Sequence, residues 1–225
     1  MCGRITIKIP LANVQEHFSI ARGLDVIKDW SPRYNVGPTT PVPCVRVIAD
    51  SRELFSARWG LIPSGTTGVK PTGSFNAKSE TLVTCPLYQD AFKSRRCLVI
   101  ASGFYEWQFL SPHDSQPYYI TLRSGAPMAM AGVWESWQSS DGEFLETCAI
   151  CTTKSNSMME RIYDRMPVIL PTERFDQWLD PMNQDSSTLL PLLSPLSSEE
   201  LQAWPVSKDV GNVARQGAYL IKPIF

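Results

Sequence analysis

The chain opens with the sequence MCGRIT, which places a cysteine directly after the initiating methionine. If Met1 is removed, Cys2 carries a free α-amine and a thiol on adjacent carbons, and no internal cysteine offers both nucleophiles. This pair makes Cys2 a candidate nucleophile. A cysteine at this position also occurs by chance, so a functional role for Cys2 needs support from the rest of the chain.

Three other segments carry polar side chains in constrained surroundings. Asn76 follows a glycine-rich loop in SFNAKSE, where an asparagine is suited either to cap a helix or to orient an amine. Glu106 ends a strongly apolar segment in GFYEWQ; it is either solvated at a strand edge or partly desolvated, which would raise its pKa and suit it to proton transfer. Tyr163 and Arg165 stand in ERIYDRMPVIL, where an arginine after an aspartate usually forms a structural ion pair. Taken singly, each of these residues could have either a structural role or a role in catalysis or binding.

Composition excludes several classes of protein. The 225 residues carry a formal net charge of −1, which argues against a non-specific coat on nucleic acid but leaves room for a local basic groove. No apolar run approaches the roughly 20 residues of a membrane span, and the start lacks the pattern of a signal peptide. We therefore expect a cytoplasmic protein without membrane contact.

The cysteines and histidines argue against a metal site. Cys148 and Cys151 form a C-x-x-C in ETCAICTTK, but no second pair of ligands follows, so we expect them to pack in a buried strand. The chain has two histidines, His17 and His113, which weakens a Cys–His peptidase or a histidine-based metal site. We expect neither a metal nor another cofactor.

The remaining pattern predicts many strands and a few short helices. Helices are predicted over 11–20, 76–82, 88–96, 172–179 with Thr172 as N-cap, and 197–204 with a capping box of Ser197 and Glu200. Strands are predicted over 42–50, 52–63, 96–108, 117–122, 128–137, 146–154 and 165–170, with loops over 31–43 and 64–74. This order predicts an α+β fold: a single compact domain over 1–225 of antiparallel or mixed β-sheets, partly barrel-like, with short peripheral helices.

Seven separated blocks then occur in one order: MCGR, RYNVGPT, ARWGLIPSG, FNAKSET, RRCLVIASGFYEW, YDRMPVIL and VSKDVGNVARQG. Together they closely resemble the SOS-response-associated peptidase (SRAP) family, also called abasic-site processing proteins. The matching blocks run from residue 2 to about 217. The specificity of the resemblance comes from the number of blocks, since each one alone is a short pattern.

The resemblance implies a DNA-damage response protein that loses Met1 and crosslinks covalently to abasic sites in single-stranded DNA through a thiazolidine on Cys2. Family members of this kind act without a cofactor, and we expect a monomer that joins the nucleoid at damaged DNA, including junctions with duplex. Cys2, Asn76 and Glu106 fall on the family's nucleophile, positioning amide and acid/base carboxylate. Five further residues fall near positions that hold the DNA backbone or the sugar: Arg4, Asn35, Lys78, Thr152 and Arg165.

Two positions depart from the family pattern. Tyr163 stands where the family usually has a histidine, and this fourth expected catalytic residue would donate a hydrogen bond at pH 7 but would be a poor acid. The segment Ser64–Gly65–Thr66 stands where family members often have a tryptophan on which an unpaired base can stack.

Two other functions stay open at this point. The first is a thiol peptidase that uses Cys2, in the narrowest case only on its own Met1–Cys2 bond. The second is a reader of modified bases, or of junctions between single-stranded and duplex DNA, that binds without covalent chemistry.

Overall fold

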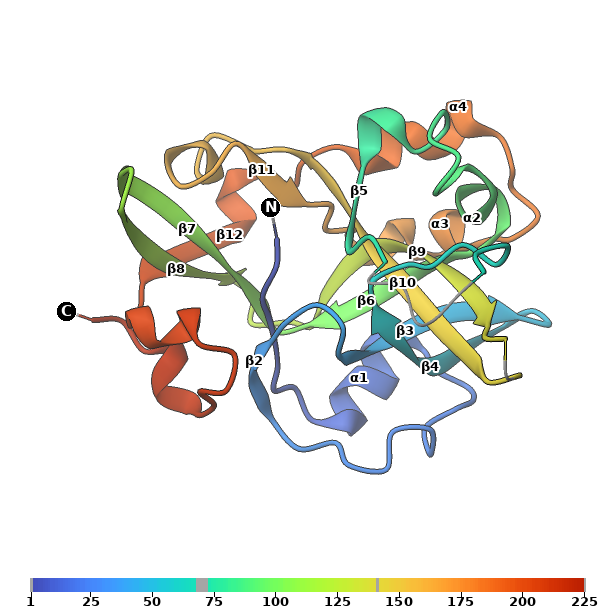
Figure 1. Cartoon of the computed structure of the whole chain (residues 1–225), viewed down its shortest axis with the longest axis horizontal. Helices are drawn as coiled ribbons and strands as arrows, with labels where there is room; N and C mark the ends of the chain where they lie inside the picture. The colour runs from blue at the N-terminus through green and yellow to red at the C-terminus, as the bar shows by residue number, and fades with distance from the viewer. Residues whose placement is uncertain (1, 68–72, 141, 225) are drawn as a thin grey trace.

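The computed structural model describes residues 2–67, 73–140 and 142–224. Within these ranges the strands form two sheets (Figure 1). The five-stranded sheet has the order β12 (Leu201–Pro205), β8 (Asp114–Leu122), β7 (Gly103–Ser111), β1 (Ile5–Ile7) and β2 (Arg33–Val36). The seven-stranded sheet runs β11 (Arg165–Pro167), β10 (Phe144–Lys154), β4 (Ser51–Trp59), β3 (Pro41–Ile48), β6 (Arg96–Ala101) and β9 (Met128–Gln138), with β5 (Asn76–Lys78) paired to β10.

The second sheet closes on itself as a barrel, because β10 pairs with β9 as well as with β4. Strand β6 lies between two apolar clusters, and all six of its residues are buried. Leu98 and Ile100 pack into the cluster that contains the helices, while Cys97 and Val99 face the other cluster. Burial on both faces explains why this part of the sequence is a continuous apolar run without alternation.

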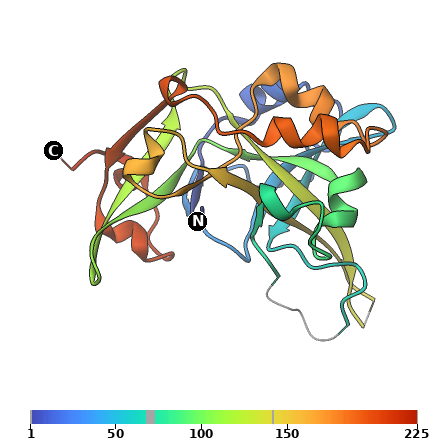
Figure 2. The ribbon, with the colours of Figure 1, turned by 90° about the horizontal axis from the view of Figure 1, so that it is seen from above.

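Short helices cover one side of the barrel: α1 (Leu11–Phe18), α2 (Gln89–Ser94), α3 (Phe175–Leu179) and α4 (Ser186–Leu189). Single 3₁₀ turns connect other elements: η1 (Ser79–Thr81), η2 (Met159–Arg161), η3 (Thr172–Arg174), η4 (Leu190–Leu193), η5 (Ser198–Glu200), η6 (Lys208–Gly211) and η7 (Ala218–Ile221). Figure 2 shows these elements around the sheets. The predicted α+β class, with a barrel-like sheet and peripheral helices, is confirmed. In the described part of the chain, no helix has the length and apolar character needed to cross a membrane.

The prediction of one continuous strand over 96–108 is wrong. It is two strands, β6 and β7, that belong to different sheets. The break comes at Ser102, whose Oγ accepts a hydrogen bond from the Lys8 backbone N–H at 2.8 Å. Gly103 follows in a site where a Cβ would lie 2.5 Å from both the Ile120 carbonyl and the Tyr119 hydroxyl. The glycine therefore lets the chain cross closely from the barrel to the five-stranded sheet.

Other segments also differ from the predictions. The helix predicted from Asn76 is strand β5 followed by the single turn η1, because parallel pairing with β10 satisfies its backbone groups. The predicted loop over 31–43 contains β2 and the start of β3. Thr172 does not cap a helix, since η3 starts there after Pro171 without a side-chain cap. Ser197 does cap a turn, accepting from the Glu199 N–H, but the segment continues as strand β12.

A buried arginine ties α2 and α3 to the barrel. Arg96, at the start of β6, is 3% exposed, and burial lowers the pKa of its guanidinium to about 10. It donates to five backbone carbonyls, those of Phe92, Lys93, Trp178, Asp180 and Asn183. Since a guanidinium has five N–H donors, this arrangement uses all of them. The ends of α2 and α3 are thereby fixed to the same barrel strand.

Replacing this arginine tests the arrangement. We expect Arg96→Met to lower the free energy of unfolding by about 3 kcal/mol or more, because it leaves buried carbonyls without a donor. Urea unfolding followed by tryptophan fluorescence measures the change. Arg174→Met, at an exposed arginine of η3, is the matched control and should change stability by less than about 0.5 kcal/mol. Equal losses in the two variants would contradict the role given to Arg96.

Candidate active site at the start of the chain

The start of the chain lies between the two sheets. Strand β1 is paired on both edges, with β2 through Ile5 and Val36 and with β7 through Ile5 and Phe104. The Tyr105 N–H donates to the Arg4 carbonyl at 2.9 Å, so the pairing with β7 continues toward the N-terminus. Both ribbon views show the blue start of the chain entering between the β7–β8 hairpin and strand β5 (Figures 1 and 2). Residues 2–4 are therefore held beside β7.

Cys2 is fully buried in the apolar cluster that also contains Met159, Ile162 and Met166. Its backbone carbonyl accepts a hydrogen bond from the Asn76 Nδ2 at 2.9 Å. Burial raises the pKa of the Cys2 thiol well above its usual range, and the nearby Glu106 raises it further. The thiol is therefore protonated at neutral pH in this environment, and a base is needed to activate it.

Asn76 is held in place from its backbone side. Strand β5 runs parallel to β10 with Asn76 opposite Ile150, and the Tyr88 hydroxyl donates to the Asn76 carbonyl at 2.9 Å. The side-chain Oδ1 is buried and has no hydrogen-bond partner among the described residues. Because Oδ1 belongs to the same amide that contacts Cys2, it is an acceptor close to the start of the chain.

Glu106 is the buried acid of the site. It lies on β7 opposite Tyr118 and is 4% exposed. Burial raises the pKa of its carboxyl to about 7, and the neighbouring Asp164 also acts to raise it. A carboxyl with this pKa is present in both protonation states at neutral pH, so it can both give and take a proton.

Tyr163 lies near the same carboxyl. Its ring centroid is 6.5 Å from that of Phe109 on β7. Burial, together with Asp164 and Glu106, raises the pKa of the Tyr163 phenol above its ordinary value. The hydroxyl therefore keeps its proton at neutral pH and acts as a hydrogen-bond donor.

The pairing registers bring Lys78, Thr152 and Arg165 together. Thr152 lies opposite Lys78 across the β5–β10 pairing and opposite Pro167 across the β10–β11 pairing. The Arg165 Nη2 donates to the Thr152 carbonyl at 2.7 Å. The same guanidinium makes two hydrogen bonds to the Glu80 carboxylate. Lys78 is exposed beside this group and presents a cation to solvent.

Arg4 and Asn35 are placed differently, against the C-terminal part of the chain. The Arg4 Nη1 donates to the Asn35 Oδ1 at 2.8 Å and to the Val210 carbonyl at 2.9 Å. The Asn35 Nδ2 lies within hydrogen-bond distance of the Val210, Asn212 and Arg215 carbonyls. The buried Asn35 amide is thus engaged in holding this segment against β2.

Several contacts around the site were not predicted from the sequence, above all that of Glu80. Glu80 stands four residues after Asn76, but nothing in the surrounding sequence indicates that it pairs with Arg165. Cys148 and Cys151 are fully buried, as predicted. Over the described ranges, no three His, Cys, Asp or Glu side chains come together in a way that would hold a metal ion.

The family model of the SOS response associated peptidases (SRAP) matches residues 1–213. The chain is 37% identical over 223 residues to the abasic site processing protein YoqW of Bacillus subtilis, an alignment that covers 99% of each chain. It is 34% identical over 215 residues to the abasic site processing protein HMCES of Xenopus tropicalis, covering 81% of this chain and 63% of the other. The chain therefore belongs to the SRAP family.

Solved structures show the same fold. A crystal structure of a protein from Bacteroides thetaiotaomicron matches with a TM-score of 0.87 at 23% identity and covers 100% of both chains. A phage-related protein from Bordetella bronchiseptica matches with a TM-score of 0.70 at 28% identity, over 92% of this chain and 95% of the other.

The raised pKa of Glu106 predicts a pH dependence of stability. Between its ordinary value of 4.5 and about 7, the folded protein binds a proton on Glu106 that the unfolded chain has released. The free energy of unfolding contributed by this group therefore falls as the pH rises through that interval. Glu106→Gln removes this dependence, so we expect its melting temperature to exceed that of the wild type at pH 8 and to lose that advantage at pH 4.5.

Melting curves at a series of pH values measure this difference. Glu173→Gln, at an exposed position in η3, is the control and should follow the wild type at every pH. If the melting temperatures of Glu106→Gln and the wild type changed in parallel with pH, the pKa of Glu106 would not be raised in the folded protein, which would contradict the prediction.

Proposed function

We propose that this protein crosslinks covalently to abasic sites in single-stranded DNA through Cys2, after removal of Met1. The observation that carries the proposal is the placement of Cys2, Asn76 and Glu106. Asn76 binds the Cys2 carbonyl, and the Glu106 carboxyl has a pKa of about 7 and influences the thiol. Similarity to proteins named for abasic site processing supports the same substrate.

The chemistry balances without an outside reactant. The Cys2 amine adds to the aldehyde carbon of the open abasic sugar and forms a carbinolamine, which loses water to give an imine. The thiol then adds across the C=N bond: sulfur bonds to carbon, and its proton ends on nitrogen. The product is a thiazolidine, and one water molecule is released. Because both nucleophiles belong to one residue, ring closure is intramolecular and avoids the entropy cost of a second encounter.

Glu106 is suited to both proton transfers. In its protonated form it donates to the departing hydroxyl of the carbinolamine, and as a carboxylate it accepts the thiol proton during ring closure. Such a partner is needed because burial keeps the Cys2 thiol protonated at neutral pH. The Asn76 Oδ1 is the acceptor that would orient the amine, and it does so without competing as a base.

The DNA partner would be held by the cluster on β5, β10 and β11. Lys78 presents a cation to the phosphate backbone, with Thr152 and Arg165 beside it, and Arg4 contributes from the other sheet. We assign the protein to the cytoplasm and to the nucleoid when bound to damage, as a monomer acting on single strands and at junctions with duplex. Release of the crosslink would make it lyase-like.

A Cys2-dependent peptidase is the main alternative, and the surroundings of the histidines weigh against a broad one. The His17 ring packs 4.9 Å from Phe18 and 6.0 Å from Phe175 in the helical layer, and His113 lies in the turn between β7 and β8. Cleavage limited to the Met1–Cys2 bond would need only Glu106 as the base. Non-covalent DNA reading is the other alternative.

Substitutions of the nucleophile separate these functions. Cys2→Ala should abolish the heat-stable adduct with abasic single-stranded DNA, while Cys2→Ser should leave only an imine that borohydride traps, because serine is a much weaker ring-closing nucleophile at pH 7. An extra residue that blocks the Cys2 amine should also prevent the adduct. Denaturing gels measure it, and Cys85→Ala, at a partly buried cysteine outside the site, should behave as wild type. A stable adduct with Cys2→Ala, or with the blocked protein, would refute the thiazolidine.

Tyr163 gives a second test. Its phenol stays protonated at neutral pH and is a poor acid, so we expect Tyr163→His to speed the opening of the abasic sugar, the release of the crosslink, or both. Tyr163→Phe should have a modest effect because little acid catalysis is lost. A time course of adduct formation, followed by a chase with competitor DNA, measures both rates. Loss of activity in Tyr163→Phe without rescue in Tyr163→His would make the tyrosine a catalytic group in its own right.

A further inference from the structure

Two apolar side chains are exposed near the tip of the β7–β8 hairpin. Phe109 is 69% exposed and Leu110 is 58% exposed. The hairpin projects from the body of the molecule in both ribbon views (Figures 1 and 2). Single exposed apolar residues are common on protein surfaces, so the position of this pair decides whether it has a role.

Phe109 lies beside the candidate active site. Its ring centroid is 6.5 Å from that of Tyr163, and the two ring planes are inclined at 46°. The Glu106 carboxyl is near enough to Tyr163 to contribute to the raised pKa of its phenol. The two rings therefore form an aromatic surface next to the buried carboxyl of the site.

Side-chain contacts hold the hairpin in this position on both of its strands. On β7, the Gln108 Nε2 donates to the Arg161 carbonyl of η2 at 2.7 Å. On β8, the Asp114 carboxylate pairs with Lys208 of η6 at 2.5 Å. The first contact joins the hairpin to the segment that carries Tyr163, so the fold sets the spacing of the two rings.

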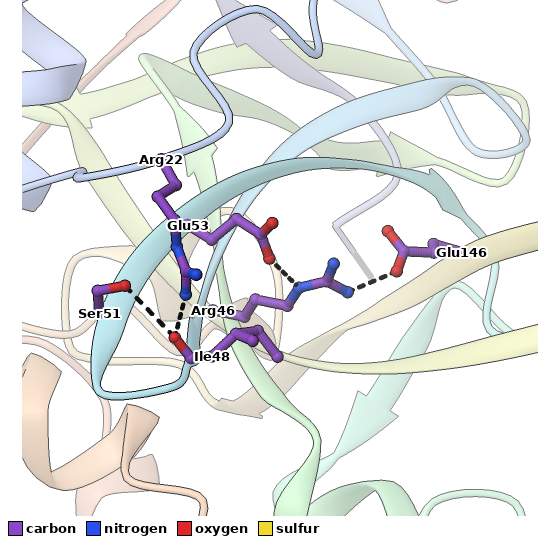
Figure 3. Close-up of polar contacts among 6 residues, drawn as sticks. All are labelled: Arg22, Arg46, Ile48, Ser51, Glu53 and Glu146. Carbon is purple, nitrogen blue, oxygen red and sulfur yellow. Dashed lines mark hydrogen bonds and ion pairs between the residues drawn. The ribbon is translucent and has the colours of Figure 1, made fainter.

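The tip of the β3–β4 hairpin gives a comparison within the same protein. Ile48 is 41% exposed there, and its carbonyl accepts hydrogen bonds from Arg22 and Ser51 (Figure 3). This tip carries an aliphatic side chain rather than an aromatic ring. Both ribbon views place it at the opposite end of the molecule from the β7–β8 tip (Figures 1 and 2). It is therefore an exposed apolar position without a relation to the site.

Phe144 is the second comparison, because it is also a highly exposed phenylalanine. It begins strand β10 and is 73% exposed. Thr152 of the site lies eight residues further along the same strand, which at 3.3 Å per residue is a distance of about 26 Å. Phe109 and Phe144 thus match in residue type and exposure but differ in their distance from the site.

The charges around the aromatic surface favour a neutral partner. Asp164 and Glu106 both act on the Tyr163 phenol. Carboxyl groups oppose the approach of a phosphate, whereas a base presents an uncharged face. The exposed Lys78 belongs to β5, and the start of the chain enters between β5 and the hairpin (Figures 1 and 2). A DNA strand that crosses Cys2 therefore meets a cation on one side and aromatic rings on the other.

We propose that Phe109, with Tyr163 beside it, stacks on the base next to the abasic nucleotide in single-stranded DNA. The inference rests on the proposed function and adds a specificity-determining contact to it. Since the abasic nucleotide has no base of its own, a contact with the neighbouring base helps to set the position of the strand over Cys2. Stacking on an aromatic ring accepts any base, so the contact leaves the sequence around the damage unrestricted.

Two oligonucleotides test the stack without the covalent step. Both carry a tetrahydrofuran analogue of the abasic site, which has no aldehyde, and in the second strand the nucleotides on either side of the analogue also lack bases. We expect Phe109→Ala to weaken binding of the first strand by about fivefold or more, because one base–aromatic stack is lost. Binding of the second strand should not change. Fluorescence anisotropy measures both affinities.

Two further variants make the result decisive. Phe144→Ala removes the matched phenylalanine and should change neither affinity. Phe109→Leu keeps an apolar side chain without the ring, so it should resemble Phe109→Ala, and it carries the test if Phe109→Ala does not fold. Equal weakening of both strands, or no weakening of either, would overturn the proposal. If the wild type showed the expected binding but formed no adduct with true abasic DNA, the proposed function would fail and the stack would stand.

Discussion

The pairing of β1 on both of its edges is the constraint on which the site depends. A strand in the interior of a sheet cannot shift along its neighbours without breaking hydrogen bonds on two sides, so the position of residue 2 is fixed by β2 and β7. The surrounding groups are then placed relative to that point. Asn76 reaches the Cys2 carbonyl from the barrel, and Glu106 lies on the neighbouring strand of the same sheet as β1.

Strand β10 plays the corresponding part on the barrel side. It pairs with β4, β5, β9 and β11, so one strand sets the register of Asn76, Lys78 and Arg165 together. Because side chains alternate across a sheet, a slip of one residue in any of these pairings would turn the corresponding side chain away from the site. Closure of the barrel through β9 opposes such a slip, and this rigidity suits a site that must align two nucleophiles with one carbon.

The sequence predicted local features better than distant contacts. The apolar segment before Glu106 left its carboxyl either solvated or partly desolvated, and the structure shows it buried. The many strands with few short helices correctly indicated a barrel-like α+β fold. The sequence predicts a helix from Asn76 because asparagine is a favourable N-cap, whereas parallel pairing with β10 makes this segment a strand. Neither the contact of Glu80 with Arg165, 85 residues away, nor that of Asn35 with the C-terminal segment has a local signal.

The long separation between β1 and β7 has a consequence for biosynthesis. Strand β7 begins at Gly103, so the first residues have no completed sheet until more than a hundred others have been made. At about 5–20 residues per second, translation leaves the N-terminus accessible for several seconds or longer. Once the sheet forms, Cys2 is fully buried. If another enzyme removes Met1, as the proposed function requires, that enzyme competes with folding, because the start of the chain is accessible before this sheet forms and is buried afterwards.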